Sequence, residues 1–188
     1  SSMPFRDRTI DRVVLTHPHS DHVGGLAEVL HGYDVANILE REVTHDSPSY
    51  LAWRRLVLEE GAKVIHASTG QLIALDGGAF IRVVGPPAHL LRGTSSDIDN
   101  ASVVLRLEYG DVSFLLTGDT FREGEAALVG SGVPLNSNVL KVGHHGSRSS
   151  TSLEFLAAVS PDAAVISAGV DNRFGHPHQD TVETLLRH

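Results

Sequence analysis

The sequence predicts an α/β fold, because two periodicities alternate along it. Short apolar, β-branched runs end in polar or glycine-rich turns, and amphipathic segments with helical spacing lie between them. Several of the apolar runs are followed by a loop that carries aspartate or histidine. Layered α/β proteins place their functional groups where strands end, so this pattern predicts a site along one edge of a sheet.

The first half of the chain is expected to contain one long helix and six strands. The helix starts after Ser47, an N-cap residue followed by proline, and runs to about Glu60 before Gly61 stops it. The last two strands form a hairpin that turns at Gly110-Asp111, and residues 86–100 form a loop. The six strands are expected over residues 10–15, 63–66, 71–75, 80–84, 102–107 and 112–117.

The second half is expected to alternate helices with strands. No apolar run approaches the ~20 residues that span a bilayer, which predicts a soluble domain. A chain of 188 residues suits one well-buried domain, so a single domain is expected over 1–188, with residues 1–4 a tag remnant or fragment boundary. The helices are expected near 122–129, 153–159 and 180–186, and the strands at 139–142 and 163–167.

Composition narrows the chemistry. The absence of cysteine removes disulfides, thiolate metal sites and cysteine nucleophiles. The net charge of −8 argues against a long basic groove that grips nucleic acid, although bound metal ions can supply positive charge locally. Histidine is the outlier, because seven of the twelve histidines fall in three short clusters.

The densest of these clusters follows the first expected strand. Its metal-capable side chains form an H-x-H-x-D-H pattern, made of His17, His19, Asp21 and His22. Neutral imidazoles and carboxylates are ligands that Zn and Mn accept. The alternate residues His17 and His19 can point into one site, whereas the adjacent Asp21 and His22 can turn toward a second. The spacing therefore predicts bound metal that is used for chemistry.

Three later strands also end in metal-capable residues. Asp119 follows residues 112–117 after a glycine turn, and it suits a carboxylate that bridges two metals. The other residues are His144 and His145 after 139–142, and His176 and His178 in the loop after 163–167. Each also has a structural interpretation. Asp119 could cap the next helix, the His144 pair could form a solvated turn, and the His176 segment could lead into a helix.

These motifs resemble those of the metallo-β-lactamase superfamily, in THPHSDHVGG at 16–25, TGD at 117–119 and GHPH at 175–178. Two further stretches, DNASVVL at 99–105 and LKVGHHGS at 140–147, are similar to the C-terminal hydrolase domain of ComEC-type DNA-uptake (competence) proteins. The resemblance implies a four-layer αββα sandwich with a dinuclear site. It also implies a nuclease that degrades the non-imported DNA strand beside a membrane channel, on the extracytoplasmic side of the bacterial plasma membrane.

Two departures from the superfamily pattern affect these expectations. About a dozen residues precede His17, so the usual N-terminal strands are expected to be missing, and an exposed sheet edge could support a homodimer. The superfamily's third histidine ligand would fall at Asn100, a weak zinc ligand. That metal site is then weak, completed by His144 or His145, or suited to a harder metal such as Mn.

The sequence thus predicts a metal-dependent phosphodiesterase or DNase with two divalent ions, Zn or Mn, acting on single-stranded DNA. Asp21, His144 and His145 are the expected catalytic residues, and Lys141, Ser147 and Arg148 could add donors to a phosphate. The alternatives are a lactonase or thioesterase on the same fold, or a catalytically weak docking module of a DNA channel. The expected metal ligands are His17, His19, Asp21, His22, Asp119, His144, His176 and His178.

Overall fold

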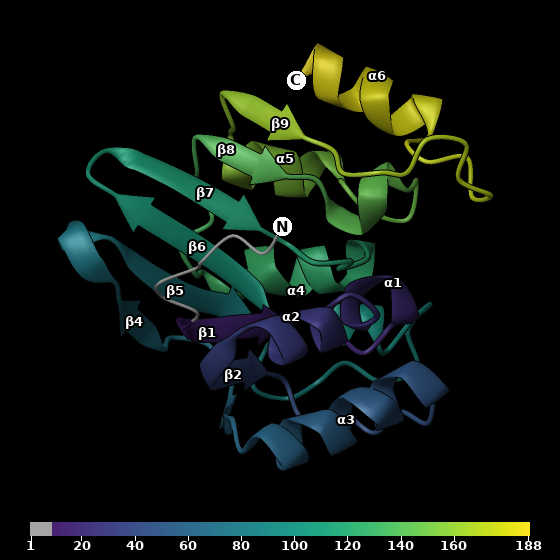
Figure 1. Cartoon of the computed structure of the whole chain (residues 1–188). Coiled ribbons are helices and arrows are strands. Elements are labelled where there is room, and N and C mark those ends of the chain that lie inside the picture. The colour runs from purple at the N-terminus through teal and green to yellow at the C-terminus, as the bar shows by residue number, and fades with distance from the viewer. Residues whose placement is uncertain (1–8) are drawn as a thin grey trace. The chain divides into compact units, whose positions relative to one another are not determined.

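The computed structural model describes residues 9–188 and divides the chain into two compact units. The first unit extends to Ala67 and the second runs over Ser68–His188 (Figure 1). Residues 1–4, expected to be a tag remnant or a fragment boundary, lie outside the described residues. Each unit has its own sheet and its own hydrophobic core, so the two are described in turn.

The first unit is a three-stranded parallel sheet with helices between consecutive strands. Right-handed crossovers between neighbouring parallel strands place successive helices on the same face, and α2 and α3 are indeed in contact. The strands, in spatial order, are β1 (Thr9–Leu15), β2 (Asp34–Glu40) and β3 (Lys63–His66). The helices are α1 (Ser20–Val23), α2 (Leu26–Gly32) and α3 (Pro48–Glu60).

Helix α3 has the ends that the sequence predicts. The Ser47 hydroxyl accepts a hydrogen bond from the Tyr50 amide at 3.3 Å, and Gly61 ends the helix with a left-handed φ of 70°. Its buried face carries Trp53, which packs with Val13 of β1 and other apolar residues of this unit. These contacts hold α3 against the sheet.

Strand β2 was not among the strands that the sequence analysis expected. It is the central strand of its sheet, hydrogen-bonded on both sides. Its apolar residues Val35, Ile38 and Leu39 are buried, but they do not alternate with polar ones. A central parallel strand is covered on both faces and so lacks the period-two pattern that reveals a half-exposed strand.

The second unit is a six-stranded mixed sheet in which the strands follow their sequence order. Strands β4 to β7 are antiparallel, and β7, β8 and β9 run parallel to one another. The expected hairpin is present, with its turn at Gly110-Asp111. The strands are β4 (Leu72–Ala74), β5 (Phe80–Gly85), β6 (Val104–Tyr109), β7 (Val112–Leu116), β8 (Val139–Lys141) and β9 (Ala163–Val165).

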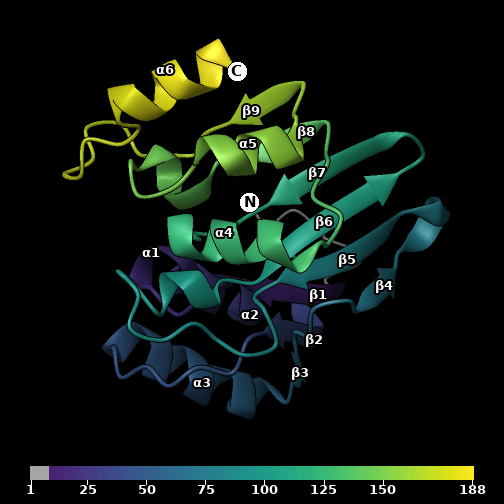
Figure 2. The ribbon, with the colours of Figure 1, turned by 180° about the vertical axis from the view of Figure 1, so that it is seen from behind.

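Helices α4 and α5 lie on one face of this sheet (Figure 2). Leu128 of α4 and Phe155 of α5 are almost fully buried against Leu115 and Leu140 of the central strands. The helices are α4 (Arg122–Ser131), α5 (Leu153–Val159) and α6 (Gln179–Arg187), and 3-10 turns lie at Asp76–Gly78, Asp99–Ala101 and Gly143–Gly146. The predicted α/β class is thus confirmed, and the ends of the expected elements lie within two residues of the observed ones.

Within residues 9–188 no helix combines the length and the apolar character that crossing a membrane requires.

Candidate metal centre

The first histidine cluster lies directly after β1. His17 and His19 occupy the loop, whereas Asp21 and His22 belong to the first turn of α1, which His19 precedes as N-cap. The whole cluster was expected on a turn, so its second half is more regular than the sequence indicated. The loop after β1 and the short helix that follows it bring the four side chains close together.

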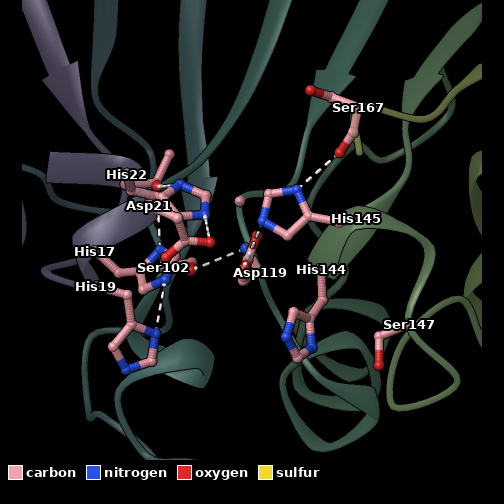
Figure 3. Close-up of polar contacts among 12 residues, drawn as sticks. His17, His19, Asp21, His22, Ser102, Asp119, His144, His145, Ser147 and Ser167 are labelled. Carbon is pink, nitrogen blue, oxygen red and sulfur yellow. Dashed lines mark hydrogen bonds and ion pairs between the residues drawn. The ribbon is translucent and has the colours of Figure 1, made fainter. Parts of the chain in front are cut away.

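Hydrogen bonds from Thr16 orient two of these rings. Its hydroxyl lies 3.2 Å from Nδ1 of His17 and 3.2 Å from Nδ1 of His22. The Nε2 atoms of both rings then point away from Thr16. Nε2 of His17 lies 3.1 Å from Nδ1 of His19. Nε2 of His22 lies 3.7 Å from Oδ2 of Asp21 (Figure 3). The cluster thus presents two pairs of potential ligand atoms.

This donor set suits divalent metal ions. The ring centroids of His17 and His22 are 4.1 Å apart and those of His17 and His19 are 4.8 Å apart, so several ring nitrogens lie within a small volume. Imidazoles beside a carboxylate are the ligands that zinc and manganese take. A hydroxyl that fixes Nδ1 of a ligating histidine orients the ring, as supporting groups around metal ligands commonly do.

The second cluster follows three neighbouring strands of the six-stranded sheet. Because β7, β8 and β9 are adjacent and parallel, their carboxyl ends meet at one edge. Gly118, with a φ of 56°, turns the chain after β7 and places Asp119 there, 3 % exposed. The Ser102 hydroxyl accepts a hydrogen bond from the Asp119 amide at 3.2 Å. The loops after β8 and β9 supply the histidines.

His145 is the histidine that lies beside Asp119. Its Nδ1 donates to the Ser167 carbonyl at 2.8 Å, and its Nε2 lies 3.3 Å from Oδ2 of Asp119 (Figure 3). Hydrogen bonding to Asp119 raises the pKa of His145 to about 9. A metal ion and a proton compete for such a pair of atoms, because ligands must lose their protons to bind metal.

His144 has different partners, although it precedes His145 directly. Its Nδ1 lies 2.9 Å from the Ser149 hydroxyl, and its ring stacks on Phe121 with centroids 4.8 Å apart. Both histidines have positive φ angles, 45° and 54°, which non-glycine residues rarely adopt. This backbone turns the two neighbouring rings toward different groups. The sequence left the roles of His144 and His145 open, and the structure separates their surroundings.

His176 and His178 also differ from each other. His178 receives a hydrogen bond from the Arg148 amide at Nδ1 and donates its own amide to the Gly146 carbonyl, both at 3.0 Å. It therefore joins the loop of β9 to the loop of β8. The ring of His176 lies 5.3 Å from that of His144, and burial lowers its pKa, with the neighbouring histidines adding to the effect. Of the two histidines in this loop, His176 is the one whose ring lies next to that of His144.

Asn100 stands where the resemblance implies a histidine ligand, and its amide is used elsewhere. Oδ1 accepts hydrogen bonds from the amides of Phe121 and Gly124 at 3.1 and 3.0 Å, and Nδ2 donates to the Thr94 hydroxyl at 3.0 Å. Asn100 thus caps the start of α4, a role that the sequence analysis had considered for Asp119. The neighbouring carboxylate, Asp99, is buried and metal-capable, and the sequence analysis did not select it.

A family model described as "Metallo-beta-lactamase superfamily" matches residues 4–170 of the chain. The chain belongs to this superfamily. Its α/β fold, with two sheets and flanking helices, is the metallo-β-lactamase fold, as expected. The four-layer stacking of the sheets and the missing N-terminal strands stay predictions.

Relatives of the chain include competence proteins. It is 33% identical to ComE operon protein 3 of Bacillus subtilis strain 168 and 34% identical to competence protein ComA of Neisseria gonorrhoeae. Each match covers 96% of this chain and 23% of the relative, so the chain spans less than a quarter of their length. It is thus a metallo-β-lactamase-fold, hydrolase-like domain homologous to a segment of competence proteins, and it carries clusters of histidine and aspartate that fit metal ions.

Among solved structures, CmlA, a diiron β-hydroxylase from Streptomyces venezuelae, matches with a TM-score of 0.63 and 18% identity. The match covers 96% of this chain and 42% of CmlA. At this identity the likeness concerns the fold alone.

Proposed function

We propose that this chain is a two-metal phosphodiesterase that cuts DNA, with single strands as the preferred substrate. The pair His144 and His145 carries the proposal. One imidazole lies beside the carboxylate of Asp119, while the other is held by Ser149, so a single loop can supply a metal ligand and a donor to a phosphate oxygen. The likeness to competence proteins favours DNA as the substrate.

The proposed ligands follow from the two clusters. In the first unit, His17 with His19 and Asp21 with His22 form one ligand pair each, as their facing atoms indicate. In the second unit, the ligands are drawn from Asp119, His144, His145, His176 and His178. We favour Asp119, His145 and His176, and add Asp99 as a further carboxylate, because His178 is engaged with Arg148 and His144 with Ser149. We also propose that residues 1–188 act as one domain.

When bound, zinc or manganese would activate a water molecule and neutralise charge on the phosphate. The chain's own groups then position the substrate. His144, stacked on Phe121, offers Nε2 to a phosphate oxygen, and the exposed Arg148 adds positive charge on the same loop. Lys141 and Ser147 are poorer candidates, because the Lys141 amine donates to the Val142 carbonyl and the Ser147 hydroxyl accepts from Ser149.

The first test is cleavage of labelled DNA and of bis(p-nitrophenyl) phosphate with Mn, Mg and Zn. We expect Asp119→Ala to lower the rate at least about 100-fold, because it removes the carboxylate that we propose as a metal ligand in the second cluster. Asp111→Ala is the matched control, since Asp111 is exposed in the hairpin turn at the other end of β7. Equal cleavage by the Asp119→Ala variant and the unsubstituted chain with every metal would contradict the proposal.

The same samples distinguish the alternatives. Hydrolysis of a lactone or thioester panel without phosphodiester cleavage would indicate an acyl hydrolase on the same fold. Less than one metal ion per chain after reconstitution would favour a docking module.

We further propose the cellular setting that the motif resemblance to ComEC-type DNA-uptake proteins implies. The domain would accompany a membrane channel in a longer protein, face the extracytoplasmic side of the plasma membrane, and degrade the strand that is not imported. Among the described residues β1 pairs only with β2, so its outer edge could support a homodimer.

A further inference from the structure

A long loop joins β9 to α6 (Figure 1). Hydrogen bonds of the Asn172 side chain fix its conformation. The Asn172 side chain accepts hydrogen bonds from the amides of Phe174 and His176, at 3.2 and 3.0 Å, and donates to the carbonyls of Gly169 and His176. One side chain thus fixes the backbone on both sides of Phe174. The loop is also fastened to the loop after β8, where a Cβ on Gly146 would lie 2.7 Å from Cβ of Pro177.

This construction leaves a large aromatic ring in solvent beside the second cluster. Phe174 is 60% exposed and is not part of the unit's hydrophobic core. Its ring is stacked, offset, on His176 at 5.7 Å between centroids, and the Arg173 guanidinium lies 4.8 Å from its centroid. A single exposed apolar side chain is ordinary on a protein surface. Phe174 is distinguished by its position, because a fixed loop holds its ring against His176 of the second cluster and beside a guanidinium.

The charge of the surrounding segments favours a polyanion. Residues 117–121, 139–150 and 163–178 contain three cationic side chains, Lys141, Arg148 and Arg173, against two acidic side chains, Asp119 and Asp171, which gives +1. The whole chain carries −8. The edge of the sheet that holds the histidines is therefore locally positive within a negative protein. An aromatic ring with an arginine on a positive edge is the arrangement that single-stranded nucleic acid binds.

We propose that Phe174 is the stacking platform for one base of single-stranded DNA at the second cluster, with Arg173 on the neighbouring phosphate. This inference rests on the proposed function and deepens it. A base that enters takes the place of the guanidinium on the ring, and Arg173 turns to the phosphate. Duplex bases are stacked on one another, so the platform selects unpaired strands. The fixed loop keeps Phe174 beside His176, and the stacked base is thus held next to the site of cleavage.

The test is a double-mutant cycle in which the Phe174 ring and the DNA bases are removed separately and together. Binding of a fluorescent single-stranded oligonucleotide is measured by anisotropy in the Asp119→Ala background, where the strand is not cut, with an intact strand and with one made abasic throughout. We expect Phe174→Ala to weaken intact-strand binding about 5- to 150-fold, which corresponds to the loss of one base stacked on an aromatic ring. Binding of the abasic strand should change less than about twofold, because only the phosphate contacts remain.

Two matched variants exclude simpler explanations. Phe174→Leu keeps an apolar side chain but loses the ring face, so it should weaken intact-strand binding nearly as much as Phe174→Ala. Tyr109→Ala removes another aromatic ring, 63% exposed, from the hairpin end of the sheet, and should leave both strands bound as before.

Equal effects of Phe174→Ala on intact and abasic strands, or no effect on either, would overturn the inference. Full binding by Phe174→Leu would also overturn it and assign the residue to an apolar protein contact. Hydrolysis of bis(p-nitrophenyl) phosphate by the unsubstituted chain reports on the proposed function separately. If that hydrolysis is present while the base-dependent binding is absent, the inference alone fails.

Discussion

Asn100 holds the start of α4 through the oxygen of its side-chain amide, while the nitrogen donates to Thr94. Helix starts leave backbone N–H groups without partners, and here a side chain from 21 residues earlier accepts two of them. A histidine at this position could not accept two amide hydrogens and donate to Thr94 at once. Hydrogen-bonding capacity therefore explains why this chain has an asparagine that caps a helix where the resemblance implies a histidine ligand. The adjacent Asp99 keeps a carboxylate in the same turn.

Replacing Asn100 by alanine should therefore lower stability rather than metal content. We expect Asn100→Ala to cost about 2–3 kcal/mol in the free energy of unfolding, because the amides of Phe121 and Gly124 lose their acceptor and Thr94 loses its donor. Urea unfolding measures the cost, and elemental analysis of the same protein should find the unsubstituted metal content. Loss of a metal ion with unchanged stability would show instead that Asn100 is a ligand.

Single residues of the site were predictable to different degrees. The H-x-H-x-D-H cluster and Asp119 stand out because metal-capable side chains follow apolar strands at close spacing. The difference between His144 and His145 was not predictable, since it depends on two consecutive positive φ angles that no spacing rule contains. Asp99 was missed because a single aspartate in a polar loop carries no periodic signal.

At the scale of elements, α4 shows how the surroundings of a glycine can outweigh its low helix propensity. Gly124 and Gly130 both lie in this helix, where glycine is ordinarily less favourable than alanine. A Cβ on Gly124 would lie 2.5 Å from Cγ2 of Thr120 and 2.7 Å from Oδ1 of Asn100, whereas a Cβ on Gly130 meets nothing within 4 Å. The first glycine is required by the cap, and the second is not.

The two alanine substitutions should accordingly have opposite signs. Gly130→Ala should raise the free energy of unfolding by about 0.5–1 kcal/mol through helix propensity. Gly124→Ala should lower it by about 1–3 kcal/mol, because the methyl group displaces the amide of Asn100. Thermal and urea unfolding of both variants in parallel give the comparison. A stabilising Gly124→Ala would mean that Asn100 does not cap the helix.

Most elements were predictable because their ends are chemically marked. Helix α3 has Ser47 and Gly61 at its ends, and the β6–β7 hairpin has Gly110-Asp111. Strand β2 was not predictable, since a strand covered on both faces loses its alternation. Sheet order also lies beyond sequence periodicity, because it is fixed by which strands pair over long separations. The parallel β7–β8–β9 group is what brings the second cluster together.

At the scale of the whole molecule, charge and histidine content describe a protein that needs metal ions for its proposed task. A chain of net charge −8 repels a polyanion on balance. Metal ions held by the histidine and aspartate clusters would reverse this locally, in addition to the positive edge at the second cluster. The composition thus agrees with phosphodiester chemistry only when metal is bound, which makes metal loading the decisive variable.

The most direct test of this account is the cleavage rate of labelled single-stranded DNA, measured against the number of Mn or Zn ions bound per chain. The chain is stripped of metal, reloaded stepwise and assayed at each step. The account predicts little cleavage with one ion per chain and full activity with two, reversed by chelation. Cleavage that is unaffected by removing metal, or binding of less than one ion per chain at saturation, would contradict it.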